Sequence, residues 1–196
     1  MPAADPAGYV RGQYEGYQSV DGVAAGSTTE TYAALRLWID NWRWSGVPFL
    51  IRAGKSLPVR TTEVRIVFQA PPPLGFDDDD GVQEPNQLVL RVDPAAGARL
   101  VLQAQSRTST SVRAVDLDVD LGGPNVPTPY EELLHAAIVG DATLFTREDV
   151  VEETWRVLTP LLDLPSAPET YAQGSWGPTD ADRLAEGVGG WREPWA

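Results

Sequence analysis

Four segments in the middle of the chain alternate between apolar and polar residues with a period of two. They are residues 62–69, 86–92, 98–105 and 112–120. Successive side chains of a β-strand point to opposite faces, so the alternation predicts strands with one apolar and one polar face. Connections marked by Pro or Gly favour antiparallel neighbours over helical crossovers. We therefore predict an antiparallel sheet in this part of the chain.

Two earlier segments extend the pattern. Residues 31–41 place apolar side chains on one face, at Leu35, Leu37 and Ile39. Residues 47–53 form a short apolar run that follows a Ser-Gly turn signal, and together the two segments predict a β-hairpin. A helix remains an alternative for residues 31–41, because Ser27 and Glu30 have the spacing of a capping box and Ala and Leu favour helix.

Helix signals begin after residue 125. Thr128, Pro129 and Glu131 supply an N-cap, a first-turn proline and a capping-box acid. A second helix, opened by Thr146, is predicted over residues 149–163. Its apolar stripe consists of Val150, Val151, Trp155, Leu158, Leu161 and Leu162.

Pro160 is expected to kink or end the second helix, and a third, short helix follows Pro178. Strands followed by helices are typical of an α+β fold, here a large, mainly antiparallel β-sheet with helices packed on one face. We expect residues 1–8 to form a flexible leader and residues 9–196 to form one domain, because a chain of 196 residues suits one well-buried core.

Charge and composition exclude several classes of function. A formal net charge of −13 disfavours nucleic acid and anionic membranes as partners, since their phosphates bind basic surfaces. No apolar run approaches the length of a membrane span and the amino terminus is unlike a signal peptide, so we expect a cytoplasmic protein. With no Cys and one His, we expect no thiol chemistry and no metal site.

The acidic segment 71–85 is predicted to be a solvated loop, because its four consecutive Asp do not have the spacing of an EF-hand. His135 has no nucleophile at helical spacing, and we expect no catalytic role for it. Asp116, Asp118 and Asp120 alternate with apolar residues, as on the solvent face of a strand. We assign no catalytic residue in this chain.

The most informative stretch is residues 52–60, where a predicted strand runs into Gly54. Lys55 and Arg60 follow on a loop that contains a proline, and loop cations on a rigid strand can bind an anionic ligand. The chain has fourteen Arg and a single Lys, which suggests that this position requires a compact ammonium group. An ordinary exposed lysine is the alternative interpretation.

Arg65 and Arg91 lie on the polar faces of two predicted strands. If these strands are neighbours, the two guanidinium groups can share an anion. The alternative is a surface ion pair with Glu63 or Asp93. No glycine-rich fingerprint follows a strand anywhere in the chain, so the sequence predicts no nucleotide-binding fold and no cofactor bound by this chain alone.

Six stretches in order closely resemble the carboxy-terminal domain of glucose-6-phosphate dehydrogenases. They are GQYEGY (12–17), STTETYAA (27–34), residues 41–68, PNQLVLRVDP (85–94), residues 146–162 and GSWGP (174–178). The resemblance spans about residues 9–191. The arginine-rich composition of these stretches is most similar to bacterial, actinobacterial-like members.

This resemblance implies a sheet domain that contributes to substrate binding and to dimer formation. By position, Lys55 and Arg60 match two basic residues of the family that bind glucose 6-phosphate. The family's NADP-binding Rossmann domain and catalytic His have no counterpart in these residues, so NADP is expected only for the full-length enzyme and the chain is not expected to be active alone. Arg65 and Arg91 match residues that bind a structural NADP in some members, but Thr61 and Asp93 depart from that pattern and we do not predict this cofactor.

Our first hypothesis is thus the substrate-binding and dimerisation domain of a glucose-6-phosphate dehydrogenase, binding glucose 6-phosphate or a similar sugar phosphate. It would form a homo-oligomer through the sheet and pair with a separate Rossmann-domain partner. One alternative is a stand-alone, non-catalytic scaffold. Another is a repurposed cofactor-independent enzyme.

Overall fold

The structure is a computed structural model that describes residues 1–70, 84–105, 112–122, 128–162, 164 and 166–195. The chain divides into two compact units. The first comprises Met1–Val59 and Pro129–Arg192, and the second comprises Arg60–Thr128 and Glu193–Ala196. The polypeptide therefore passes from one unit to the other three times along its length.

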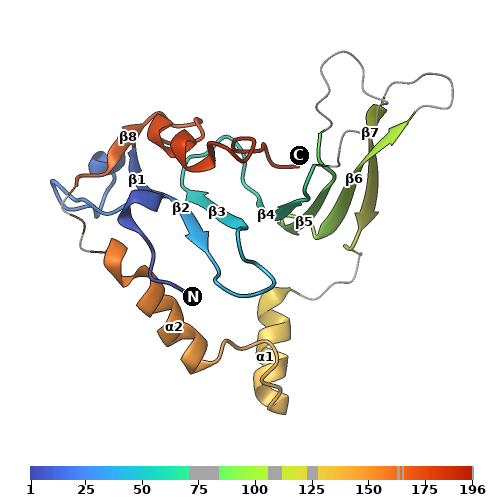
Figure 1. Ribbon diagram of the computed structural model, residues 1–196. Helices are drawn as coiled ribbons and strands as arrows, with labels where there is room; N and C mark the ends of the chain where they lie inside the picture. Colours follow the sequence, from blue (N-terminus) through green and yellow to red (C-terminus); the bar gives the residue numbers. More distant parts are fainter. Residues whose placement is uncertain (71–83, 106–111, 123–127, 163, 165, 196) are drawn as a thin grey trace. The chain divides into compact units, whose positions relative to one another are not determined.

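A four-stranded sheet forms the centre of the first unit. Its strands are β1 (Tyr9–Tyr14), β2 (Tyr32–Trp38), β3 (Pro48–Gly54) and β8 (Glu169–Tyr171), in the order β3-β2-β1-β8. Figure 1 shows β8 beside β1, and this is the parallel pair of the sheet, whereas β1, β2 and β3 pair antiparallel. The predicted hairpin of β2 and β3 is confirmed, and the helix alternative for residues 31–41 is wrong.

Both faces of this first sheet are covered. On one face Val10, Tyr32 and Ala34 pack against Ala181 and Leu184, which lie on the 3-10 helix η4 (Thr179–Ala185). On the other face Leu37 packs against Ala4 and against the helical residues Val157 and Leu161. The core of the first unit thus lies on both sides of β2, because apolar residues occupy both alternating sets of positions in that strand.

The second unit contains the antiparallel strands that the alternation predicts. They are β4 (Thr62–Val67), β5 (Gln87–Asp93), β6 (Gly97–Gln105) and β7 (Val112–Asp120), which form a sheet in that order. The strand register places one kind of side chain on each face. What we call the apolar face consists of Val64, Ile66, Leu88, Leu90, Val92, Ala98, Leu100, Leu102, Val115, Leu117 and Val119.

The helices found in the described parts of the chain belong to the first unit. They are α1 (Pro129–Val139) and α2 (Glu148–Leu158), together with the 3-10 turns η1 (Pro6–Gly8), η2 (Tyr17–Ser19), η3 (Thr159–Leu161) and η4. The expected third helix is therefore a 3-10 helix. None of the helices within the described residues is long and apolar enough to cross a membrane.

Two details of α2 differ from the prediction. Its N-cap residue is Arg147 rather than Thr146, and no side chain caps it. Of the predicted apolar stripe, Leu161 is buried, but Val150, Val151, Trp155 and Leu162 are between 40% and 57% exposed. The helix continues as the 3-10 turn η3, which contains Pro160, because a proline cannot donate the helical hydrogen bond.

The predicted α+β class is confirmed, with mostly antiparallel strands divided between two sheets. The expected domain limits stay a prediction. Within residues 1–8, Ala4 is buried and its amide donates a hydrogen bond to the Val157 carbonyl at 2.8 Å. Residues 1–8 all belong to the first unit.

Candidate functional site

Lys55 follows directly on the end of β3, where the chain passes close to β2. A Cβ atom at Gly54 would lie 2.9 Å from Cδ2 of Tyr32 and 3.3 Å from the Leu57 side chain, so only glycine fits without displacing a buried ring. Lys55 itself is exposed. The sequence thus places an exposed ammonium group on a strand end that packs tightly against the core.

Hydrogen bonds fix the backbone of this turn on both sides of Lys55. The Lys55 amide donates to the Thr31 carbonyl at 2.8 Å, and the Tyr171 hydroxyl donates to the Lys55 carbonyl at 2.7 Å. One residue further on, the Gly174 amide donates to the Ser56 carbonyl at 2.7 Å. We call residues 54–56 the lysine turn.

Ser56 is the residue of the lysine turn with an unusual backbone conformation. Its φ angle is 53°, in the left-handed region that residues with a Cβ rarely adopt. Such a conformation persists only where neighbouring contacts hold it. The contacts from Thr31, Tyr171 and Gly174 supply that restraint.

Strand β3, which leads into the lysine turn, carries a cation that lies over aromatic rings. The Arg52 guanidinium lies 4.5 Å from the ring centroid of Trp176 and 4.9 Å from that of Trp191. Burial lowers the pKa of Arg52 and raises the pKa of Tyr32 to about 12. Burial also raises the pKa of Tyr171, so its hydroxyl keeps its proton and remains a donor at neutral pH.

The Lys55 ammonium has no salt-bridge partner among the described residues. A hollow of roughly 490 Å³ in the first unit has Arg36, Trp38 and Arg183 among its lining residues and does not include Lys55. The candidate site therefore rests on the lysine turn and its exposed cation.

Arg60, the second predicted substrate residue, belongs to the second unit. Its side chain is 93% exposed and its Nε lies 3.8 Å from a carboxylate oxygen of Asp93. The neighbouring Thr61 hydroxyl donates to the Asp93 carbonyl at 3.0 Å. Since Lys55 and Arg60 lie in different units, their joint action on one ligand stays a prediction.

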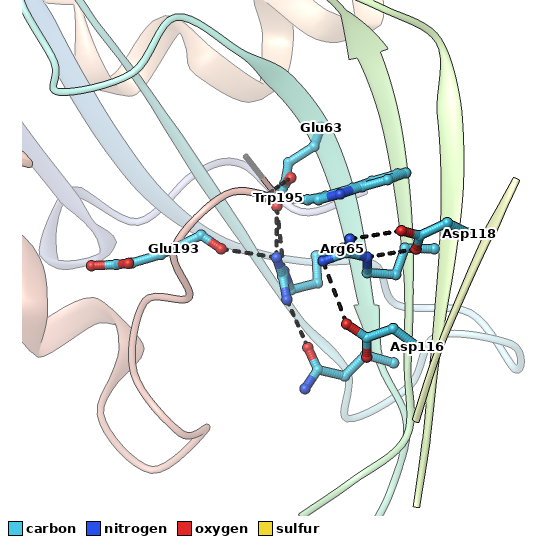
Figure 2. Close-up of polar contacts among 8 residues, drawn as sticks. Glu63, Arg65, Asp116, Asp118, Glu193 and Trp195 are labelled. Carbon is cyan, nitrogen blue, oxygen red and sulfur yellow. Dashed lines mark hydrogen bonds and ion pairs between the residues drawn. The ribbon is translucent and has the colours of Figure 1, made fainter. Parts of the chain in front are cut away.

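The polar face of the second sheet holds an indole that lies against two cations. Trp195 has the Arg91 guanidinium 4.2 Å and the Arg99 guanidinium 4.5 Å from its ring centroid. A Cβ at Gly97 would lie 3.2 Å from Cη2 of the indole, so this glycine makes room for the ring. We call Trp195 together with Glu63, Arg65, Arg91, Gly97, Arg99, Asp116 and Asp118 the tryptophan cradle. Figure 2 labels Trp195, Glu63, Arg65, Asp116 and Asp118 among them.

Two arginines of the tryptophan cradle pair with carboxylates of the same unit. Arg65 pairs with Glu63 at 3.1 Å, and Arg99 binds both carboxylate oxygens of Asp118 at 2.7 and 2.8 Å (Figure 2). Hydrogen bonding to Arg99 lowers the pKa of Asp118. Arg65 and Arg99 are thus both engaged with the chain's own carboxylates.

Glu63 and Arg65 also form hydrogen bonds to the backbone of residues 193–195. The Trp195 amide donates to Oε2 of Glu63 at 2.8 Å, and Nη2 of Arg65 donates to the Glu193 carbonyl at 2.9 Å (Figure 2). Arg65 therefore forms the ion pair with Glu63, but the two side chains are only 19% and 12% exposed, so the pair is not a surface one. Arg91, on the neighbouring strand β5, instead donates to the Ala95 carbonyl at 2.9 Å and lies over the indole.

The other positions considered in the sequence lie on α1 and β7. His135 lies on α1 and is exposed. Asp116 and Asp118 face Arg99 rather than solvent alone. No group of three metal-ligating side chains occurs within the described residues, and most of the acidic loop 71–85, at residues 71–83, lies outside them.

Sequence reasoning missed Tyr171 and Trp195. Tyr171 lies on the three-residue strand β8, which is too short to show a period. Trp195 acts through contacts with strands far away in the sequence. The only local signal for Tyr171 is its place three residues before the GSWGP stretch.

The two mostly antiparallel sheets with flanking helices define an α+β sheet domain. A family model described as the C-terminal domain of glucose-6-phosphate dehydrogenase matches residues 3–195. The chain therefore belongs to the glucose-6-phosphate dehydrogenase family, as its C-terminal domain. This confirms the resemblance seen in the six ordered stretches.

Individual relatives agree with this assignment. The chain is 52% identical to glucose-6-phosphate 1-dehydrogenase 1 of Mycobacterium tuberculosis, over all of this chain and 42% of the relative. It is 41% identical to the glucose-6-phosphate 1-dehydrogenase of Aggregatibacter actinomycetemcomitans, over 96% of this chain and 39% of that protein. The chain thus spans less than half the length of the curated relatives it matches.

Solved structures share the fold. A glucose-6-phosphate 1-dehydrogenase from Mycobacterium avium is 51% identical, with a TM-score of 0.88 over 100% of this chain and 42% of its own. A second, described as glucose-6-phosphate dehydrogenase in complex with its substrate glucose 6-phosphate, is 28% identical, with a TM-score of 0.81 over 93% of this chain and 40% of its own.

Proposed function

We propose that this chain is the substrate-binding and dimerisation domain of a glucose-6-phosphate 1-dehydrogenase. Lys55 and Arg60 bind glucose 6-phosphate. The complete enzyme oxidises this substrate with NADP to 6-phosphogluconolactone in the pentose phosphate pathway of the cytoplasm. Hydride transfer requires an NADP-binding Rossmann domain, and no fingerprint of that domain occurs in these residues.

The lysine turn is the observation that carries the proposal. An exposed ammonium without a salt-bridge partner among the described residues lies on a backbone restrained by three hydrogen bonds. Phosphate and hydroxyl oxygens are suitable acceptors for such a group. The fold of the chain as a whole is similar to that of a relative solved with glucose 6-phosphate.

Binding of glucose 6-phosphate by the purified chain tests the role of Lys55. In isothermal titration calorimetry, Lys55→Ala should weaken the affinity about 10- to 100-fold, as expected for the loss of a hydrogen bond to a charged group. Lys55→Arg should restore only part of it, because a planar guanidinium replaces a compact ammonium. Arg60→Ala should weaken binding in the same direction.

Arg43→Ala is the matched control, since it removes one exposed cation from the β2–β3 connection of the same unit. It should leave the affinity unchanged. Equal binding by the wild-type, Lys55→Ala and Arg43→Ala proteins would contradict the proposal. Mixing the chain with a separately produced Rossmann domain, NADP and glucose 6-phosphate should then produce NADPH, and a verified complex without turnover would also count against it.

We further propose a homo-oligomer that forms through the apolar face of the second sheet. Five side chains of this face, at Val64, Leu90, Val92, Leu117 and Val119, are between 37% and 63% exposed. Exposed apolar side chains gathered on one surface mark interaction sites, because their burial on association is favourable. The identical face of a second copy provides the complementary surface that a two-fold dimer needs.

A further inference from the structure

Tyr171 is a buried phenol whose hydroxyl has a defined role in hydrogen bonding. Its side chain belongs to the first core cluster, and the residue is 3% exposed. The hydroxyl oxygen lies 2.7 Å from the Lys55 carbonyl, 3.2 Å from the Thr31 carbonyl and 3.1 Å from Oγ1 of Thr31. A phenol has one proton to donate, so the shortest of these contacts identifies the Lys55 carbonyl as its acceptor.

The direction of the remaining bonds agrees with this assignment. The Tyr14 amide donates to Oγ1 of Thr31 at 2.9 Å, which leaves the Thr31 hydroxyl proton for the oxygen of Tyr171. Tyr171 then donates to Lys55. The Tyr14 amide, the Thr31 hydroxyl and the Tyr171 hydroxyl thus donate one to the next, and the last of them donates to the lysine turn. Hydrogen bonds in such a chain strengthen one another.

Tyr32 shows that burial alone does not explain the Tyr171 hydroxyl. Its ring centroid lies 5.5 Å from that of Tyr171 and the residue is 1% exposed. The Tyr32 hydroxyl nevertheless has no hydrogen-bond partner among the described residues. Two adjacent phenols are thus similarly buried, and only the hydroxyl of Tyr171 forms a hydrogen bond to the lysine turn.

We propose that Tyr171 is a positioning residue for substrate binding, because its hydroxyl holds the backbone of Lys55 in place. This inference rests on the proposed function of Lys55. The left-handed Ser56 is maintained only by its neighbours, so loss of the Tyr171 hydroxyl lets the lysine turn relax. Relaxation moves the ammonium away from its bound position, and substrate binding must then restore the turn at a cost in affinity.

The single lysine of the chain makes a direct test possible. A sample labelled only with 15N-lysine gives one backbone amide signal, that of Lys55. In Tyr171→Phe this amide should show increased motion in nuclear relaxation measurements, and the affinity for glucose 6-phosphate should fall about 3- to 10-fold, the effect of one neutral hydrogen bond. Tyr32→Phe is the matched control and should leave both quantities unchanged.

The outcomes separate this inference from the function on which it rests. Unchanged affinity for glucose 6-phosphate in Lys55→Ala would overturn the proposed function. If Lys55→Ala loses affinity but Tyr171→Phe and Tyr32→Phe have the same affinity and the same Lys55 amide motion, only the positioning role is overturned. The relaxation measurement requires no ligand. An unchanged Lys55 amide in a folded Tyr171→Phe protein therefore contradicts the proposal by itself.

Thr31→Val provides a second variant if Tyr171→Phe does not fold. It retains the phenol and nearly the shape of the side chain, but removes the hydroxyl that precedes Tyr171 in the chain of hydrogen bonds. The Lys55 amide should become more mobile and the affinity should fall in the same direction. A Thr31→Val protein with a wild-type Lys55 signal and affinity would overturn the positioning role.

Discussion

At the scale of single residues, Tyr32 contributes to stability through its ring and not through its hydroxyl. The ring fills the centre of the first core cluster, and a Cβ at Gly177 would lie 2.3 Å from it. The hydroxyl is a buried polar atom without a partner among the described residues. A group of this kind lowers stability, because it loses its hydrogen bonds to water on folding.

The same burial makes stability depend on alkaline pH. The pKa of Tyr32 is about 12 in the folded protein and about 10 in an unfolded chain. The neutral phenol is favoured in the fold, so its contribution is complete below pH 10 and is lost as the pH rises towards 12. We predict a fall in the free energy of unfolding across this range, measured by urea unfolding at several pH values.

Tyr32→Phe isolates this residue from the other tyrosines whose pKa is also raised. The variant should be at least as stable as the wild-type protein at pH 7, and its stability should fall less steeply above pH 10. Parallel curves for the two proteins would show that Tyr32 ionises without opening the core.

At the scale of elements, the segment Glu193–Trp195 stabilises the second sheet. The indole contacts guanidinium groups from two adjacent strands, and contacts of this kind contribute about 0.5–2 kcal/mol each. We predict that Trp195→Ala lowers the free energy of unfolding of the second unit by about 1–3 kcal/mol. Amide hydrogen exchange of β5 and β6 would measure this loss locally.

Trp42→Ala is the control for the Trp195 substitution. Trp42 also lies near a guanidinium, that of Arg43, but it is 87% exposed. Its removal should change stability by no more than about 0.5 kcal/mol. Equal effects of the two substitutions would mean that the tryptophan cradle does not contribute to stability.

The accuracy of the predicted elements follows the length of their local pattern. Strand β7 occupies the predicted residues 112–120, because the strict alternation of its last six residues, Val115 to Asp120, defines a two-faced strand. β1 and β8 were not predicted. Gly12 and Gln13 interrupt the alternation of β1, and β8 has only three residues and pairs parallel with β1.

In the candidate site too, features with a local sequence signal were predicted and features that depend on distant contacts were not. The Gly54-Lys55 pair stands out locally, as a glycine at a strand end followed by the only lysine. The hydroxyl that fixes this turn comes from a residue 116 positions later. Likewise, the exposure of Trp155 on α2 was not foreseen, because an apolar stripe indicates which residues can be buried and not whether a partner covers them.

At the scale of the whole molecule, the apolar face of the second sheet predicts self-association. Leu117→Lys places a charge on this face, and its burial between two copies is unfavourable. We expect a lower molecular mass for this variant than for the wild-type protein in analytical ultracentrifugation, with a larger monomer fraction at equal concentration.

Ala114→Lys is a matched control from the same strand. Ala114 is also exposed on β7, but the register places it on the opposite, polar face with Asp116 and Asp118. This variant should sediment like the wild-type protein. A wild-type protein that remains monomeric at high concentration would contradict association through this face.

The pairing of β8 with β1 has a consequence for synthesis of the chain. Gln173, just after β8, donates to the carbonyl of Glu15, 158 residues earlier. A ribosome releases these partners far apart in time, so the first sheet cannot be completed until β8, Glu169–Tyr171, has emerged. The strands β4 to β7 follow one another in the sequence and can pair while translation continues. The second sheet can therefore form earlier during synthesis than the first.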